Sequence, residues 1–322
     1  MSVDLIVSGY PGLDHIMPIN RAPKPGETGV ILRAPRLDSP TPGGCAPNIA
    51  VACARLGIKT AVVIIIGDDQ DGKRLVEALE QEGVNIQYGI HVVPGGHTAH
   101  TFLFLDPENR HQTFYFPGAS GSKDVSIHLE QEVLGSANWG VITVGSPIHN
   151  LAVLELMVAS NIPILWSHKN DKGAFPKELV ERLAQVSAIV VLNKHEADAV
   201  QKTLELTGIS DLLQRGPKAV ILTRGAGGCR LITTEGTMDV PAVAPDHLVD
   251  PTGAGDGFCA GLLFGLHHEL SLVDCCRIGA VVASFVLEDW GCQTSLPNLP
   301  SLQERYWGAF GKDLLLSGAS LS

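Results

Sequence analysis

The chain has 322 residues, 45% of them hydrophobic, which allows one large domain or two average ones with a sizeable core. It carries 23 lysines and arginines against 34 aspartates and glutamates, a formal net charge of −11. This acidic balance argues against a protein that binds nucleic acid through a basic surface, but not against a nucleotide ligand, which needs only a few local donors.

Strands and helices alternate along most of the chain. Continuous β-branched runs such as residues 61–66 predict buried parallel strands, and apolar residues at helical spacing predict the helices between them. Residues 18–44 are rich in proline and glycine and predict turns with short strands, because a helix does not tolerate this composition. The predicted elements are, in order, strand 5–7, helix 48–57, strand 61–66, helix 71–82, a hairpin of strands 97–105 and 111–116, strand 139–144, helix 151–160, strand 162–166, helix 176–185, strand 188–192, helices 195–203 and 211–215, strand 219–223, a hairpin within 229–240, and helices 255–267 and 272–287.

This alternation predicts an α/β fold with a mostly parallel sheet and helices on both faces. Two stretches that hold only strand candidates, residues 14–42 and 96–118, do not fit that layer, and we expect them to pair as a small separate sheet. We therefore predict a single domain over residues 1–322 with a β appendage. The edges of the small sheet invite pairing, so a homodimer is open.

The cysteine pattern and the N-terminus bear on the compartment. Seven irregularly spaced cysteines without a C-x-x-C pair argue against a disulfide framework or a zinc site and favour buried thiols in a reducing cytosol. The N-terminus lacks the basic segment of a signal peptide, and the longest apolar runs, residues 61–66 and 278–287, are too short to span a membrane. We expect a cytoplasmic protein with neither a membrane nor a nucleic acid as partner.

The segment DPTGAGDGF, residues 250–258, precedes a helix of small and apolar residues. Gly253 and Gly255 let backbone N–H groups approach a ligand closely, and the helix start offers free donors and a positive dipole end to an anion such as phosphate. Asp256 stands in the first turn. It is either an acid that complements the helix dipole or a general base beside a transferring phosphoryl group, and the segment alone leaves both open.

Five segments in the same order resemble the signatures of the ribokinase-like carbohydrate kinases, also called the PfkB family. They are KPGET at 24–28, similar to the lid segment; GGCAPNIA at 43–50 with ARLG at 54–57, similar to G-G-x-x-x-N-x-A and its ending; NKHE at 193–196, for N-x-x-E; TRGAGG at 223–228, for T-x-G-x-x-G; and residues 250–258, for D-x-T-G-A-G-D-x-F. The resemblance spans Leu5 to about Asn298. It implies a three-layer α/β/α ribokinase-like fold in which residues 14–42 and 96–118 form a β lid.

The resemblance also implies an ATP- and Mg²⁺-dependent phosphotransferase acting on a hydroxyl of a small sugar or nucleoside. Asp256 would take the proton from that hydroxyl, and the backbone N–H groups of Gly253, Ala254 and Gly255 would form an anion hole for the γ-phosphoryl group. The resemblance implies substrate contacts for Asp14, Gly43, Gly44 and Asn48. It implies nucleotide contacts for Asn193, Glu196, Thr223, Gly225 and Gly228, with Asn193 and Glu196 organising Mg²⁺ and its waters. As in some family members, Asp250 and Thr252 would bind a monovalent cation such as K⁺.

Structural alternatives stand beside these roles. Gly43 and Gly44 can form an ordinary turn, Asn48 can cap the next helix, and Asn193 with Glu196 can form a capping box. Asp14 can be one acid after a strand, and residues 223–225 only a strand-end turn.

The substrate and the class of protein also have alternatives. LWSHKN at 165–170 lacks the D-x-N-x-R of fructokinase-like members, which favours a ribose-like or nucleoside-like substrate over fructose or 2-keto-3-deoxygluconate. Trp166, His168 and Lys169 either shape the pocket or, for Trp166, belong to the core. The functional alternatives are a catalytically inactive sugar- or nucleotide-binding regulatory homologue and a dinucleotide-dependent oxidoreductase. The first strand is not followed by G-x-G-x-x-G, which argues against the latter.

Overall fold

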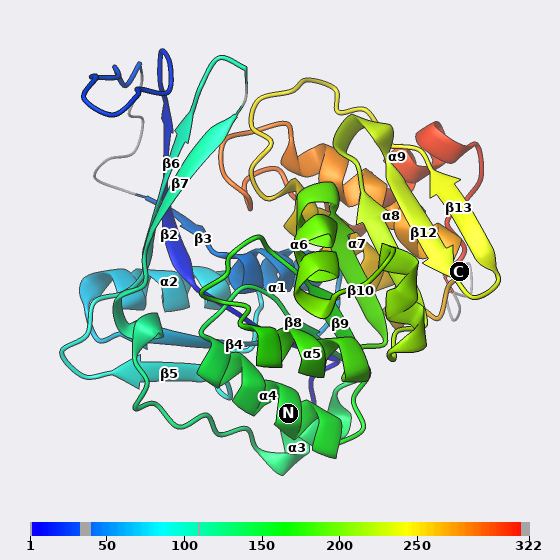
Figure 1. The fold of residues 1–322 in the computed structure, drawn as a ribbon, viewed down its shortest axis with the longest axis horizontal. Coiled ribbons are helices and arrows are strands. Elements are labelled where there is room, and N and C mark those ends of the chain that lie inside the picture. The colour runs from blue at the N-terminus through cyan, green and yellow to red at the C-terminus, as the bar shows by residue number, and fades with distance from the viewer. Residues whose placement is uncertain (1, 33–39, 109, 317–322) are drawn as a thin grey trace.

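The computed structural model describes residues 2–32, 40–108 and 110–316. Within them, the larger sheet has nine strands in the order β13-β12-β11-β10-β9-β8-β1-β4-β5 (Figure 1). Neighbours from β11 to β5 are parallel, and β12 and β13 form an antiparallel hairpin at one edge. The strands are β1 (Leu5–Ser8), β4 (Thr60–Gly67), β5 (Ile90–Val93), β8 (Trp139–Ile142), β9 (Ile164–Ser167), β10 (Ile189–Asn193), β11 (Ala219–Thr223), β12 (Cys229–Thr233) and β13 (Gly236–Val240).

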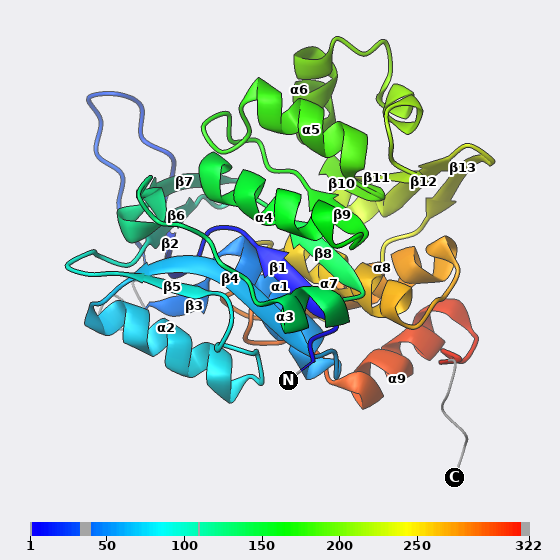
Figure 2. The same ribbon diagram turned by 90° about the horizontal axis from the view of Figure 1, so that it is seen from below.

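Helices cover both faces of this sheet, because successive strand residues point to opposite sides. On β1, Leu5 and Val7 enter the core shared with α1, α2, α7, α8 and α9, while Ile6 enters the core shared with α3, α4, α5 and α6. Figure 2 shows α4, α5 and α6 on one side of the sheet and α2 and α9 on the other. The helices are α1 (Cys45–Arg55), α2 (Gln70–Gln81), α3 (Gln131–Ser136), α4 (Pro147–Ala159), α5 (Lys177–Val186), α6 (Lys194–Leu204), α7 (Ala254–His267), α8 (Leu272–Val286) and α9 (Leu299–Phe310).

A second sheet stands apart from the first and projects from its edge (Figure 1). Its order is β3-β2-β6-β7, from β2 (Gly12–Pro18), β3 (Thr41–Gly43), β6 (His100–Leu105) and β7 (His111–Phe116). β2 and β6 are parallel, so this sheet joins two distant parts of the chain. We call it the lid sheet. The predicted three-layer fold with a small additional β-sheet is confirmed.

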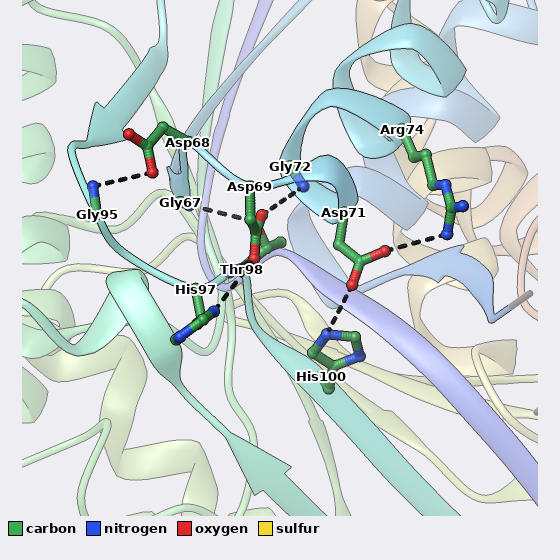
Figure 3. A network of polar contacts seen from close by, with 10 residues as sticks. All are labelled: Gly67, Asp68, Asp69, Asp71, Gly72, Arg74, Gly95, His97, Thr98 and His100. Carbon is green, nitrogen blue, oxygen red and sulfur yellow. Dashed lines mark hydrogen bonds and ion pairs between the residues drawn. The ribbon is translucent and has the colours of Figure 1, made fainter. Parts of the chain in front are cut away.

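A polar network ties the lid sheet to the main sheet (Figure 3). Asp69 caps α2: its Oδ1 accepts hydrogen bonds from Gly72 N–H (2.9 Å) and from the Thr98 hydroxyl (2.6 Å), and its Oδ2 accepts one from Thr98 N–H (2.8 Å). Two residues further on, Asp71 Oδ2 lies 3.3 Å from His100 Nε2. The two carboxylates therefore fix the start of β6 to the first turn of α2.

Several predicted elements differ from the structure. β6 begins at His100, so the prediction that His97 lies in the same strand is wrong. α1 begins at Cys45 with Gly44 as its cap, so Asn48 lies inside the helix and the alternative of Asn48 as a cap is wrong. α4 begins at Pro147 and not at Leu151, because proline suits the first turn of a helix.

Among the α-helices and strands of the main sheet in the described residues, β5, α3 and α9 were not predicted at all. All seven cysteines are free, and all except Cys45 are buried. Trp166 is fully buried and belongs to the core. In the described part of the chain, none of the helices combines the length and the apolar character that crossing a bilayer requires.

Candidate active site

The DPTGAGDGF segment forms a tight loop followed by the first turn of α7. Asp250 is fully buried; its Oδ1 accepts a hydrogen bond from Thr252 N–H (2.9 Å), and its Oδ2 accepts one from Gly291 N–H (3.4 Å). Gly253 caps the helix with φ +80°, and a Cβ there would lie 2.6 Å from the Cys292 side chain. Only glycine meets both conditions, and its use here brings the amide groups of the first turn to an accessible edge.

Asp256, the third residue of α7, is buried and held from two sides. Its Oδ2 accepts a hydrogen bond from Asn48 Nδ2 on α1 (2.9 Å), and its Oδ1 lies 3.2 Å from Lys169 Nζ. The Asn48 side chain is itself oriented by Gln293, whose Nε2 donates to Asn48 Oδ1 (2.9 Å). A row of polar groups from Gln293 to Lys169 thus fixes the carboxylate beside the helix N-terminus.

Asp14 provides a second buried carboxylate, on β2 of the lid sheet. Gly43 on β3 faces it so closely that a Cβ at Gly43 would overlap the carboxylate. The pKa of Asp14 is raised to about 7, chiefly by burial and in smaller part by the charges of Asp256 and Asp250, while a hydrogen bond with the Thr101 side chain acts in the opposite direction. Asp14 is therefore a carboxylate that hydroxyl donors from a ligand would help to ionise.

Asn193 and Glu196 meet at the start of α6, at the carboxyl end of β10. The Asn193 side chain accepts a hydrogen bond from Glu196 N–H (3.0 Å), and Glu196 Oε2 accepts one from Asn193 N–H (2.7 Å). The capping box given as the structural alternative is thus present. Burial raises the pKa of Glu196, and the charge of Lys169 opposes that rise.

Thr223, Gly225 and Gly228 follow at the end of β11. Thr223 pairs with Asn193 in the parallel register of β10 and β11, and its hydroxyl donates to the Leu192 carbonyl (3.3 Å). Gly225 begins a short 3₁₀ helix, and Gly228 directly follows it. These residues lie next to the Asn193 corner, at the same edge of the sheet.

The structure brings most of the predicted site residues together. Asp14, Gly43, Asn48, Gly253 and Asp256 form one cluster, with Gly44 at the start of α1, Asp250 beside it, and Ala254 and Gly255 in the same turn as Asp256. Asn193, Glu196 and Thr223 form a neighbouring corner, where the charge of Asp256 helps to raise the pKa of Glu196. Gly225 and Gly228 join this corner through β11.

The sequence did not assign a role to several residues of the cluster. Lys169 lies beyond the carboxyl end of β9, which was the one available signal for it. Gln293 and Cys292 lie in a segment with no recognisable motif, and Cys292 Sγ is 4.0 Å from Asp14 Oδ2. Thr101 lies opposite Asp14 in the register of β2 and β6, a pairing visible only after folding.

The fold places the chain among the ribokinase-like proteins. The crystal structure of Methanocaldococcus jannaschii nucleoside kinase, described as an archaeal member of the ribokinase family, superposes with a TM-score of 0.83 at 27% identity, covering 95% of this chain and 98% of that one. Burkholderia thailandensis nucleoside kinase in complex with inosine superposes with a TM-score of 0.84 at 22% identity, covering 96% and 100%. The latter likeness concerns the fold alone.

The sequence comparisons define the family. The model of the pfkB family carbohydrate kinases matches residues 15–299. A nucleoside kinase of Methanothermobacter thermautotrophicus is 30% identical over 309 residues, covering 96% of this chain and 97% of the relative. The chain belongs to the pfkB family of carbohydrate kinases, which confirms the predicted resemblance and the predicted phosphotransferase class and gives no support to the oxidoreductase alternative.

Proposed function

We propose that this protein transfers the γ-phosphoryl group of ATP to a hydroxyl of a nucleoside, with Asp256 as the general base. The observation that carries the proposal is the position of the Asp256 carboxylate, buried in the first turn of α7 and oriented by Asn48. A base at that position is adjacent to the amide donors of Gly253, Ala254 and Gly255, where an anion is stabilised.

The two oxygens of Asp256 have different surroundings. Oδ2 accepts the hydrogen bond from Asn48, whereas Oδ1, among the described residues, accepts no aligned hydrogen bond. Oδ1 is therefore the oxygen that takes the proton of the acceptor hydroxyl. As the new O–P bond forms, the bond from phosphorus to the oxygen of ADP breaks, and the proton moves from the hydroxyl to Oδ1.

The start of α7 supplies the electrostatic stabilisation. The first amide groups of a helix lack intrahelical acceptors and point along the helix axis. In α7 the first such bond of regular length runs from Gly257 N–H to Gly253 O (2.9 Å), and Ala254 N–H makes only a long bond to Pro251 O (3.4 Å). We therefore assign the amides of Gly253, Ala254 and Gly255 to the transferring group. Removing one donor of this type costs about 10²–10³ in kcat in well-studied cases.

The substrate side is formed by Asp14, Gly43, Gly44 and Asn48. The absence of a side chain at Gly43 leaves room for the Asp14 carboxylate itself, and a carboxylate accepts hydrogen bonds from the hydroxyl groups of a sugar. The nucleoside kinases among the similar proteins and the missing D-x-N-x-R motif both favour a ribose-bearing acceptor over a hexose.

On the nucleotide side we assign Asn193, Glu196, Thr223, Gly225 and Gly228. Glu196 is buried near the cation Lys169, and its Oε2 accepts the hydrogen bond of the capping box. Glu196 therefore suits an indirect contact with Mg²⁺ through water. When bound with ATP, Mg²⁺ would neutralise charge on the phosphates.

Asp250 and Thr252 are proposed for a monovalent cation. The Thr252 hydroxyl oxygen is buried and has no hydrogen-bond partner in the described part of the chain, and the buried Asp250 carboxylate lies in the same turn. An oxygen pair of this kind fits K⁺. Exchange of K⁺ for a large organic cation should lower kcat, and unchanged kcat would remove this assignment.

The experiment that tests the function is an ATP-consumption screen over nucleosides, pentoses, hexoses and keto-sugar acids, with the phosphorylated product identified by mass spectrometry. We expect turnover with nucleosides and product that carries one added phosphoryl group. Binding of ATP without turnover on any acceptor would favour the inactive regulatory homologue. Turnover only on hexoses or keto-sugar acids would refute the nucleoside assignment and keep the kinase. The homodimer also remains a prediction, which light scattering tests.

A further inference from the structure

Lys169 lies between the proposed base and the proposed anion hole. It follows β9 at the carboxyl end of the main sheet, and its Nζ is 3.2 Å from Asp256 Oδ1. A Cβ added at Gly255 would lie 3.4 Å from the same Nζ. The ammonium group therefore rests over the first turn of α7, beside the amides that point toward an anion.

The donors of this ammonium group are available to a ligand. Its contact with Asp256 is an ion pair without an aligned hydrogen bond, because Oδ1 accepts none from the described residues. The Lys169 side chain remains 29% exposed, whereas that of Asp256 is 4% exposed, so the cation is the more accessible partner.

The surroundings keep Lys169 charged. Partial burial alone would lower the pKa of Lys169, but nearby acids, led by Asp256 and including Glu196, hold this pKa well above its ordinary value. Lys169 therefore carries a full positive charge at the start of α7.

We propose that Lys169 is a catalytic residue that contacts the transferring phosphoryl group. Negative charge spreads over the three equatorial oxygens of that group in the transition state, and a full cation beside the α7 amides stabilises it more than partial charges alone. Lys169 stays protonated throughout; the proton of the acceptor hydroxyl goes to Asp256. This inference rests on the proposed function, since it assigns Lys169 to the same phosphoryl transfer.

A purely structural role would be different. Lys169 would then only neutralise Asp256, and its removal would have no effect on anion binding once Asp256 is also uncharged. The two roles separate in a double mutant, because a phosphoryl contact persists in the Asp256→Asn background and a neutralising contact does not.

The experiment measures binding of ADP and Mg²⁺ with and without aluminium fluoride, a mimic of the planar phosphoryl group, in the presence of inosine. In the wild type, aluminium fluoride should tighten ADP binding. Lys169→Met should lose at least about tenfold of that gain and keep the affinity for ADP alone, and kcat should fall by about 10²-fold with KM within a few-fold. Lys172→Met, which removes an exposed charge three residues further along, is the matched control and should behave as wild type.

The decisive comparison is Asp256→Asn with and without Lys169→Met. The proposal is supported if aluminium fluoride tightens ADP binding less in the double mutant than in Asp256→Asn alone. An equal tightening in these two variants overturns it. The proposal is also overturned if Lys169→Met shows the full wild-type tightening, or if the wild type shows none. If Lys169→Met does not fold, Lys169→Arg and Lys169→Gln replace it. Lys169→Arg should keep most of the tightening of ADP binding by aluminium fluoride, and Lys169→Gln should lose it. Equal behaviour of these two variants overturns the proposal. A wild type that binds the mimic but turns over no acceptor refutes the proposed function without deciding Lys169.

Discussion

Asn48 and Asp256 are 208 positions apart in the chain, yet the amide of Asn48 donates a 2.9 Å hydrogen bond to the carboxylate of Asp256. The two residues belong to the two signature segments, one on α1 and one on α7, which pack against each other. Helix packing therefore sets the orientation of the proposed base: a shift of α1 against α7 would rotate the carboxylate away from the acceptor hydroxyl.

Replacing Asp256 by asparagine should remove the base with little change of shape. We expect normal folding and unchanged affinity for ATP, with a loss of about 10²–10⁴ in kcat. Steady-state kinetics and titration calorimetry measure the two quantities. Asp198→Asn, an exposed aspartate on α6, is the matched control and should leave kcat unchanged. Near-wild-type turnover of Asp256→Asn would rule out the mechanism.

Replacing Asn48 by leucine should leave Asp256 Oδ2 buried without its donor. The expected cost is about 1–3 kcal/mol in the free energy of unfolding, because a buried acceptor loses its partner. It should also lower kcat, since the carboxylate loses its orientation, and this second effect should disappear in the Asp256→Asn background. Gln293→Leu, which removes the bond behind Asn48, should have a smaller effect on both. Urea denaturation measures the stability of the two variants, and steady-state kinetics measure their kcat. Equal effects of Asn48→Leu and Gln293→Leu would contradict the view that Gln293 acts on Asp256 only through Asn48.

The raised pKa of Asp14 predicts how ligand binding depends on pH. Hydroxyl groups that donate to this carboxylate favour its ionised form, so substrate binding should release a proton near neutral pH. The Kd should then rise by up to about tenfold for each pH unit below about 7, the raised pKa of Asp14. Calorimetry in two buffers of different ionisation enthalpy counts the proton. In Asp14→Asn the proton release should be absent; its persistence there would point to another group.

The same carboxyl makes a separate contribution to stability without ligand. Because its pKa is about 7 in the folded protein and about 4 in an unfolded chain, the folded state holds the proton more tightly. The stabilising contribution is complete below the ordinary pKa and is lost as the pH rises through about 7. Urea midpoints of wild type and Asp14→Asn should therefore diverge across this window, and parallel curves would contradict the burial of a titrating group.

Asp69 should matter for the attachment of the lid sheet. Asp69→Ala removes the cap of α2 and the two bonds to Thr98, and we expect it to cost about 1–2 kcal/mol in the free energy of unfolding. Partial burial opposes ionisation, but the bonds from Thr98 and Gly72 lower the pKa of Asp69, so this stabilisation is present above its ordinary pKa and is lost as the pH falls. Asp68→Ala, which removes one exposed bond to Gly95, is the control and should cost less. Equal urea midpoints for Asp69→Ala and Asp68→Ala would show that the hydrogen bonds of Asp69 do not stabilise the attachment of the lid sheet.

The local geometry of the candidate site could be predicted from the sequence where local rules are strong. The GAG turn and Asp256 follow from a helix start with small residues, and the Asn193 capping box follows from the spacing of two residues. Lys169 and Gln293 could not be assigned in this way, because their roles depend on the meeting of segments far apart in the chain.

The missed elements have local reasons. β5 has three partly buried residues and one exposed residue, Val92, at a sheet edge, and no alternation of apolar and polar positions. α9 buries only Leu302 and Tyr306 completely, so its apolar face is too narrow to stand out from its surroundings. The strong apolar periodicity of α2 predicted both of its ends to within one residue. α4 is only weakly amphipathic, and in the structure it begins four residues before the predicted start.

The packing of α1 against α7 also bears on how the protein is made. Ile49 and Cys53 on α1 share one core with Leu262 on α7 and Val281 on α8, which are synthesised some 200 residues later. During translation, α1 and one face of the strands must wait uncovered until the last quarter of the chain leaves the ribosome. A chain that stops before residue 250 would thus retain most of the main sheet but expose a broad apolar surface, and such surfaces lead to aggregation. Truncation at the C-terminal end is therefore expected to endanger solubility as well as activity.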